Sequence, residues 1–398
     1  MSRGRVFASM CSVVFLVNLA RIVFAPLLEP LSAAFALTES TAGLVATLAW
    51  LGSATPRIPT GYLLTRVDRH TVVLGTGGVL TGAAAFMSVA NSVVMLGVGA
   101  FLMGVASGAY FIAANPLLTE LYPERVGRTL GIHGTASQLA AVIAPLFVGA
   151  VLLAAPWRAV FGIIAVVAAV ATGGFYWAAR QIEMPDAGTE DRNLLTAARR
   201  QWPIILSGIA ILGATGFVWN GLFNFYVKYV TATKGIDAGT ANTLLTVVFA
   251  AGVPAFWVTG RLADRLPHVP LMLSILGGFV ACLFALTAAQ GLAMLAAVTA
   301  ILGYVVHSLF PALDTYLLDS LPDENRASAY SLYSGSMMIV QATGSVVVGA
   351  LVDAGFAYNT VFRTFGGLLI AILAVLVVLW AGNKLPTGGR DPSVARGD

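Results

Sequence analysis

An arginine lies in the middle of the first long apolar stretch of this 398-residue chain. This residue, Arg21, follows Asn18 by three positions, so the two side chains would share one face of a helix. An arginine at the centre of a membrane-spanning helix costs roughly 2.5–3.5 kcal/mol on insertion scales, which invites a functional explanation. Because a guanidinium can hold a carboxylate or a phosphate with two hydrogen bonds, we expect Arg21 and Asn18 to bind substrate or to take part in coupling. A structural ion pair, or a side chain that reaches the membrane surface, is the alternative.

A second group of polar residues lies in the seventh apolar stretch, at Trp219, Asn220 and Asn224. Asn224 follows Asn220 by one helical turn, and two amides beside an indole suit a polar, asymmetric ligand. We expect these residues to bind substrate, unless the amides only join neighbouring helices by hydrogen bonds. Arg57, in the second stretch, could bind an anion or reach the cytoplasmic edge of the membrane, and the two interpretations weigh equally.

Three titratable residues are candidates for proton coupling, namely His307, Asp314 and Glu29. His307 and Asp314 are seven positions apart, so they would share one face of a helix. A carboxyl in apolar surroundings can exchange a proton with the bulk, and a histidine titrates near neutrality. The alternative for Asp314 is a structural contact with an arginine or a hydroxyl. Glu29 lies at the end of the first stretch, where we expect it to be exposed.

The composition indicates what kind of elements must position these residues. Lysine and arginine number 22 and aspartate and glutamate 18, so charged residues make up 10% of the chain, against about 25% in a typical soluble domain. Apolar residues make up 58%, and the mean hydropathy is +0.86. This balance excludes both a soluble globule and a disordered chain. We predict an all-α polytopic membrane protein.

Several other classes of protein are excluded by the same inspection. The net charge of +4 is carried by scattered basic residues, so we expect no nucleic-acid partner. Cys11 and Cys282 lie inside apolar stretches and do not form a disulfide framework or a zinc motif. No phosphate-binding loop or metal-protease motif is present. We therefore predict that the protein is not an enzyme and that it uses neither a metal nor another cofactor.

Twelve apolar stretches are long enough to cross about 30 Å of hydrocarbon. A cleaved signal peptide is an alternative for the first, because Ala34–Ala36 resembles a cleavage site, but Arg21 and the length of the stretch argue against it. The predicted spans are 6–31, 41–64, 71–90, 94–118, 129–153, 158–179, 203–228, 240–260, 269–288, 291–317, 328–351 and 359–382.

The lysines and arginines predict the orientation, because cytoplasmic loops carry an excess of them. With both termini in the cytoplasm, sixteen of these residues would lie in cytoplasmic segments and four outside. We therefore predict a multi-pass protein of the cell membrane with both termini cytoplasmic. The four outer residues are Arg158, Lys228, Lys234 and Arg363.

A polar linker divides the chain into two halves that repeat each other at an offset of 199 residues. Gly61 aligns with Gly260 near a helix end, and Asn115 aligns with Asp314, so Asn115 joins the candidates for substrate binding. We expect a short surface helix around 192–200 within the linker. The predicted parts are an N-terminal six-helix bundle (1–180), a cytoplasmic linker (181–201), a C-terminal six-helix bundle (202–382) and a disordered cytoplasmic tail (383–398).

Short motifs near the helix ends make the chain resemble the major facilitator superfamily over roughly residues 5–382. The resemblance implies two pseudosymmetric bundles, alternating access to a central site, and a latch and a gating helix at the residues that match. The motifs are the loop Gly260, Asp264 and Arg265, its weaker copy at Gly61 and Arg66, and the series Gly127, Gly131, Gly134, Ala144, Pro145 and Gly149.

The chain also departs from that family's pattern. Thr65 stands where the family has an acid, and Asp68 is the residue that can take over its role in the latch. Ala100 stands where many proton-driven exporters carry an arginine, and Phe256 stands where some anion porters carry a second one. For Arg66 a latch and a simple topology signal weigh equally.

We predict a secondary active transporter that works by alternating access on a small polar solute, an organic anion, with protons as the coupling ion. Its partners would be the solute, the lipid bilayer and protons, and we expect a monomer. The alternative is an exporter of hydrophobic or cationic drug-like compounds. A sensor or a membrane enzyme on the same fold has no regulatory domain or cluster of catalytic side chains to support it.

Overall fold

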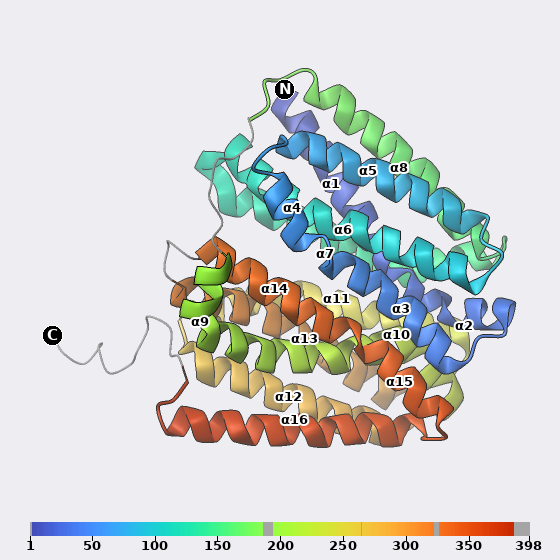
Figure 1. Ribbon diagram of the computed structural model, residues 1–398. Helices are drawn as coiled ribbons and strands as arrows, with labels where there is room; N and C mark the ends of the chain where they lie inside the picture. The colour runs from blue at the N-terminus through green and yellow to red at the C-terminus, as the bar shows by residue number, and fades with distance from the viewer. Residues whose placement is uncertain (1, 186–193, 264, 322–325, 386–398) are drawn as a thin grey trace. The chain divides into compact units, whose positions relative to one another are not determined.

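A computed structural model describes residues 2–185, 194–263, 265–321 and 326–385 of the chain (Figure 1). The described residues contain helices and no strand. The chain forms two compact units, residues Met1–Asp191 and Arg192–Asp398, and we describe each by itself. Much of the predicted linker (181–201) and of the predicted tail (383–398) lies outside the described residues.

Unit 1 is the first of these and holds the helices of the N-terminal half. Within it α6 packs against α3 and α5, and α1 packs against α7 and α8. The elements of this unit are α1 Ser2–Ile22, α2 Phe24–Phe35, α3 Glu39–Ala54, α4 Arg57–Leu63, α5 Arg69–Ser88, α6 Val93–Leu121, η1 Pro123–Arg125, α7 Val126–Leu152 and α8 Arg158–Ala179.

Unit 2 holds the helices of the C-terminal half, in which α13 packs against α11 and α12 and α10 packs against α15. The elements of this unit are α9 Leu194–Gly208, η2 Ile209–Gly213, α10 Ala214–Lys234, α11 Ala238–Ala263, α12 His268–Ala288, α13 Leu292–Ser320, α14 Arg326–Ala342, α15 Gly344–Asp353 and α16 Tyr358–Ala381.

Eleven helical segments of the described chain are long and apolar enough to cross a membrane, where the sequence predicts twelve spans. The difference lies in the predicted span 41–64, which is divided into α3 and α4. Pro56 stands between them and has no N–H to donate to a carbonyl one turn earlier. The first predicted span, 6–31, is likewise divided at Val23. Pro26 lies in the first turn of the helix that follows, and it too has no N–H to donate. The apolar stretches were therefore located correctly, but two of them are broken helices.

The helix that enters unit 2 differs from the sequence prediction. A separate surface helix around 192–200 was expected, but α9 runs from Leu194 without a break into η2 and α10. The segment η2 has π-helical hydrogen bonding, and Gln341 of α14 donates from Nε2 to the carbonyl of Leu212 over 3.3 Å. A side-chain donor thus satisfies a carbonyl at the irregular turn.

Two glycines related by the internal repeat lie at equivalent helix contacts in the two units. Gly104 of α6 lies against the carbonyl oxygen of Ala49 on α3, so that a Cβ there would overlap this oxygen. Gly303 of α13 lies in the same way against the carbonyl oxygen of Val248 on α11. Both members of each pair are related by the offset of 199 residues. The two units therefore share a close crossing of their second and fourth spans, which only a residue without a side chain allows.

Candidate functional site

Arg21 lies on α1 and is held by side chains from the same helix and from α3. Its Nη2 donates to Oδ1 of Asn18 over 2.7 Å, and its Nη1 donates to Oγ of Ser53 over 3.3 Å. The guanidinium carbon lies 4.1 Å from the centre of the Trp50 ring, a cation–π contact. Asn18 in turn donates from Nδ2 to the carbonyl of Ser137 on α7 over 2.7 Å. Three helices therefore fix one cation inside unit 1.

The charge of Arg21 has only neutral partners among the residues that the structure describes. Its hydrogen bonds go to an amide and a hydroxyl, and its Nε is buried without a hydrogen-bond partner. Arg57 of α4 lies on the same side of the unit and donates from Nε to the carbonyl of Ser53 over 3.4 Å. An arginine keeps its positive charge in a protein, so the charge of Arg21 has no negative counterpart among the described residues.

In unit 2 a buried histidine lies among aromatic rings. His307 of α13 is 5% exposed, and its ring centre lies 5.7 Å from that of Trp219 and 5.8 Å from that of Phe249. The Nδ1 atom lies 2.7 Å from the carbonyl oxygen of Gly303. A carbonyl can only accept, so Nδ1 carries a proton and Nε2 is the atom that can gain or lose one.

The Arg21 and His307 clusters occupy related places in the two units. The offset of 199 residues carries Trp50 to Phe249, Ser53 to Gly252 and Gly108 to His307. In unit 1 the absent side chain of Gly108 makes room for the backbone carbonyl of Ser53, and in unit 2 the absent side chain of Gly252 makes room for the ring of His307. The same offset carries Arg21 to Asn220, so it is the neighbours and not the two groups themselves that correspond, around a permanent cation in one unit and a titratable ring in the other.

Asn220 and Asn224 join α10 to α15. The Oδ1 atom of Asn220 accepts from Oγ of Ser345 over 2.8 Å and from Nδ2 of Asn224 over 3.1 Å. Nδ2 of Asn220 and Oδ1 of Asn224 are buried and have no hydrogen-bond partner among the described residues. The pair therefore acts as a contact between helices, as the alternative interpretation of the sequence has it, and retains one donor and one acceptor for a further partner.

A second buried histidine carries a hydrogen-bond network that the sequence does not reveal. The hydroxyl of Tyr110 on α6 donates to the carbonyl of Met10 on α1 over 2.7 Å and lies 3.0 Å from Nε2 of His133 on α7. Since the single hydroxyl proton goes to Met10, His133 must donate from Nε2. Residues 23 positions apart on different helices share no periodic signal that a sequence reading could detect.

The remaining predicted site residues lie apart from these clusters. Asn115 of α6 and Glu29 of α2 are exposed, and Arg66 and Arg265 are exposed beyond helix ends. Asp68 directly precedes α5, where the neighbouring Arg69 forms an ion pair with Glu120 of α6 over 3.0 Å. Asp264 and the side chain of Asp314 lie outside the described residues. The predicted gating and latch glycines and proline lie on α4, α7 and α11 as Gly61, Pro145, Gly149 and Gly260.

Comparison with known proteins finds a family whose model matches most of the chain. The family model of the Major Facilitator Superfamily matches residues 10–292 and 209–396. The chain is 25% identical over 316 residues to an L-fucose-proton symporter of Escherichia coli, a match that covers 70% of this chain and 72% of the relative. It is 24% identical over 364 residues to a purine ribonucleoside efflux pump of Salmonella paratyphi B, which covers 88% and 87%.

Solved structures show the same fold at low sequence identity. A D-xylose-proton symporter superposes with a TM-score of 0.75 at 16% identity and covers 96% of this chain and 98% of its own. A bacterial homologue of the human lysosomal transporter Spinster, in an inward-facing and occupied conformation, superposes with a TM-score of 0.74 at 17% identity, with 95% of both chains covered.

Proposed function

Because the chain belongs to the Major Facilitator Superfamily and is a membrane transporter rather than an enzyme, we propose that it moves a small organic anion by alternating access and that Arg21 binds this anion. The observation that carries the proposal is the set of partners around Arg21. Its guanidinium contacts an amide, a hydroxyl and an indole, and the described residues offer it no carboxylate. A bound anion would supply the missing negative charge.

The other predicted contacts complete this proposal. In unit 2, the spare donor of Asn220 and the spare acceptor of Asn224 are uncharged groups of the kind that bind a polar solute. Trp219, Asn115 and Arg57 are proposed as further contacts, on the basis of their position in the repeat or their chemistry. The latch and gate, at Gly61, Arg66, Asp68, Gly260, Asp264, Arg265, Pro145 and Gly149, stay part of the proposal.

We infer protons as the coupling ion. The fixed Nδ1 of His307 leaves Nε2 as a site for proton exchange, and Asp314 and Glu29 are the further candidates. The similarity to an L-fucose-proton symporter supports proton coupling, and uptake by symport is the direction we propose. The orientation with both termini in the cytoplasm and the monomeric state belong to the same proposal.

A second candidate is an exporter of hydrophobic or cationic compounds. It is favoured by the aromatic rings of unit 2, where Trp219, Phe223 and Phe249 lie with ring centres 5.4–6.1 Å apart. Aromatic faces attract cations and apolar rings. The similarity to a purine ribonucleoside efflux pump is compatible with export of a ring compound.

Ligand-induced thermal stabilisation separates the two candidates. Purified protein would be screened against a panel of organic anions and a panel of lipophilic cations, together with the variants Arg21→Gln and Arg158→Gln. Arg158 is the matched control, because it also stacks on a tryptophan, Trp157, at 4.4 Å and donates to a carbonyl, that of Ala90, over 2.7 Å. We expect anions to stabilise the wild type and Arg158→Gln but not Arg21→Gln. Stabilisation by cations that survives Arg21→Gln would favour the exporter instead.

Proton coupling is tested in liposomes. Uptake of the stabilising anion would be measured with and without an inwardly directed proton gradient for the wild type, His307→Gln and Asp314→Asn. We expect the gradient to accelerate uptake by the wild type and at least one variant to lose this response while it still exchanges anion across the membrane. An unchanged gradient response in both variants would remove His307 and Asp314 from the proton path.

A further inference from the structure

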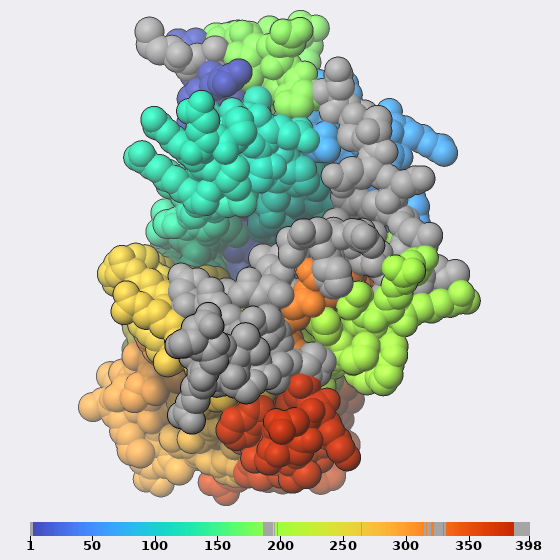
Figure 2. Space-filling view, turned by 90° about the vertical axis from the view of Figure 1, so that its left-hand side faces the viewer, coloured from blue at the N-terminus to red at the C-terminus, as the bar shows by residue number. Residues whose placement is uncertain are grey.

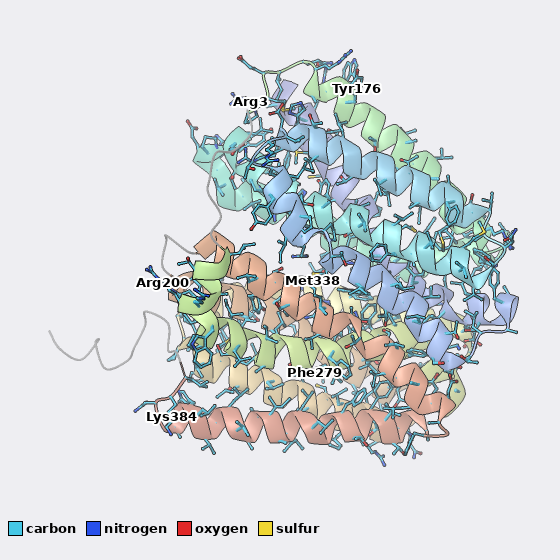
Figure 3. The ribbon with its side chains drawn as sticks, in the orientation of Figure 1. Arg3, Tyr176, Arg200, Phe279, Met338 and Lys384 are labelled. Carbon is cyan, nitrogen blue, oxygen red and sulfur yellow. The ribbon has the colours of Figure 1, made fainter. Side chains whose placement is uncertain are left out.

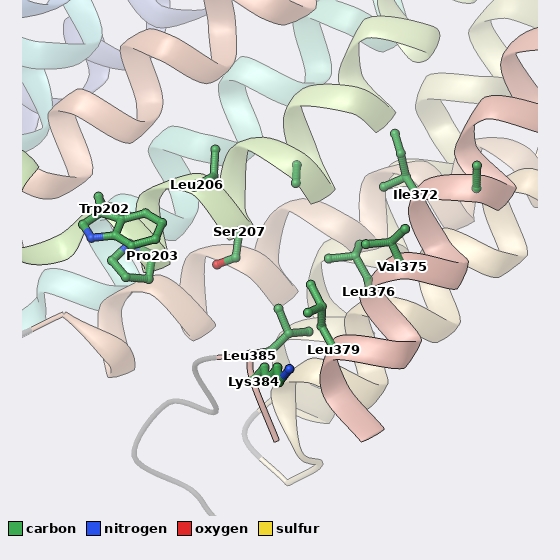
Figure 4. Close-up of a pocket in the computed structure, with 12 residues that line it drawn as sticks. Trp202, Pro203, Leu206, Ser207, Ile372, Val375, Leu376, Leu379, Lys384 and Leu385 are labelled. Atoms are coloured by element: carbon green, nitrogen blue, oxygen red, sulfur yellow. The ribbon is translucent and has the colours of Figure 1, made fainter. Parts of the chain in front are cut away.

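An apolar groove lies on unit 2 between α9 and α16, at the end of the unit where the chain leaves α16 (Figure 4). The groove encloses about 500 Å³. Its cause is a divergence of two helices: α9 packs against α14 and α13, whereas α16 packs against α12 and, further along, against α10. Ala210 of the π-helical turn η2 lines the inner end of the groove.

The dimensions of the groove match a hydrocarbon chain. Its walls extend from Trp202 on α9 to Ala210 on η2 and from Ala371 to Leu379 on α16, and at 1.5 Å per residue each wall is about 12 Å long. One leaflet contributes about 15 Å to the hydrocarbon thickness of a bilayer. Ser207 is the hydroxyl residue of the lining, and its Oγ already donates to the carbonyl of Ile204 over 2.9 Å. The groove thus offers apolar contact along almost a whole leaflet.

Basic residues lie at one end of this groove, where α9 begins and where the chain has left α16. Lys384 lines the groove and is exposed, and its side-chain amine has no hydrogen bond or ion pair among the described residues. Arg199 and Arg200 are exposed on the first turns of α9, and Figure 3 shows Arg200 and Lys384 at the same end of unit 2. Figure 2 views this end, with α9 in lime green and the last turns of α16 in red on neighbouring parts of the surface. Trp202 is 60% exposed beside them, as is typical of a residue at the level of lipid headgroups.

We propose that this groove is a binding site for one anionic phospholipid, with an acyl chain between α9 and α16 and the phosphate at Lys384 and Arg199. Arg199 precedes the lining residues Trp202 and Pro203 by three and four positions and therefore shares their face of α9. An acyl chain needs a long apolar wall, and a phosphate at its end needs cations beside that wall. Both features meet here, with the cations at the end where the lining stops. Basic residues near a membrane surface each attract an anionic headgroup by roughly 1 kcal/mol, which corresponds to about a fivefold change in affinity.

The chain itself offers a poorer occupant for the groove. The segment that follows Leu385, residues 386–398, contains glycine, proline, arginine and aspartate and a single large aliphatic residue, Val394. Such a segment would bring charges and unpaired backbone groups against an apolar wall. Lipid binding in this groove is independent of which solute the protein transports.

Native mass spectrometry of the purified full chain tests the proposal. Phosphatidylglycerol and phosphatidylcholine with identical acyl chains would be titrated onto the wild type, Lys384→Gln, Ala371→Trp and Arg261→Gln. Arg261 is the matched control, because it is an exposed arginine stacked at 3.7 Å on another exposed tryptophan, Trp257, and does not line the groove. Ala371→Trp fills the groove without a change in charge.

The proposal gives each variant a distinct result. The wild type prefers phosphatidylglycerol, Lys384→Gln lowers this preference about fivefold, and Arg261→Gln leaves it within about twofold. Ala371→Trp weakens binding of both lipids. Equal binding of the two lipids by the wild type, or equal losses in Lys384→Gln and Arg261→Gln, would overturn the proposal. So would a variant lacking residues 386–398 that binds both lipids more tightly, since the tail would then be the natural occupant.

Discussion

In each unit a glycine allows the second and fourth spans to cross closely, and replacing this glycine by alanine should lower stability by the same amount in both units. In Gly303→Ala the new Cβ would overlap the carbonyl oxygen of Val248, and in Gly104→Ala that of Ala49. A backbone oxygen inside a helix cannot turn aside, so the whole helix has to move. Overpacking of this kind costs about 1–3 kcal/mol, from which a gain of about 0.4–1 kcal/mol for replacing a helical glycine is subtracted. We expect a net loss of about 1–2 kcal/mol for either substitution.

Two other glycines are the matched controls for this prediction. Gly82 of α5 and Gly367 of α16 lie in helices of the same two units, and apart from the adjacent backbone of their own helix no described atom lies within 4 Å of a Cβ placed on either. Alanine at these positions should leave stability unchanged or raise it by up to about 1 kcal/mol. Because the substitution is the same in all four variants, the difference between the two pairs isolates the helix crossing.

Unfolding of the purified variants in detergent, followed by tryptophan fluorescence against temperature and against added denaturing detergent, measures these differences. The account predicts lower midpoints for Gly104→Ala and Gly303→Ala than for Gly82→Ala and Gly367→Ala. If all four variants unfold together, the close approach of the second and fourth spans is refuted. A loss in one unit alone would refute the equivalence of the two crossings.

Three further predictions concern single contacts. Tyr110→Phe leaves His133 without its buried hydroxyl partner and should lower the free energy of unfolding by about 1–3 kcal/mol. The losses in a double-mutant cycle with His133→Gln should be non-additive, and additive losses would contradict the network. Gly252→Ala places a Cβ against the ring of His307 and should weaken the response of transport to a proton gradient more than it changes binding of the solute, measured in liposomes; an unaltered response would count against the cluster. Glu120→Gln should change the unfolding free energy by about 1 kcal/mol or less, because its ion pair is partly exposed, and a larger loss would mean that more depends on this contact than the geometry indicates.

The sequence is sufficient to predict the all-α fold and the repeat. Length and hydropathy locate the apolar stretches, and a constant offset reveals the duplication. Hydropathy alone does not reveal the breaks after Val23 and Thr55, although Pro26 and Pro56 are visible signals for them. The fusion of α9 with the seventh span was missed because a polar segment can still continue as a helix.

The candidate site was only partly predictable, because local spacing reveals contacts within a helix but not between helices. The spacing of Arg21 and Asn18 predicts a shared face, and the structure joins them by a hydrogen bond of 2.7 Å. Trp50 and Ser53 reach Arg21 from another helix, and no pattern in the sequence indicates them. Asn220 and Asn224 were placed on one face correctly, whereas their partner Ser345 lies 125 residues away from Asn220.

Uptake of an organic anion into liposomes that contain the purified protein tests the central claim most directly. The anion would be the one that stabilises the protein best, and the wild type would be compared with Arg21→Gln and Arg158→Gln. Hydrogen bonds to a charged group contribute about 1.5–3 kcal/mol, so the account predicts that Arg21→Gln loses saturable uptake about 10- to 100-fold while Arg158→Gln retains it. Saturable uptake by Arg21→Gln at the rate and affinity of the wild type would contradict the role of Arg21 as the group that binds the transported anion.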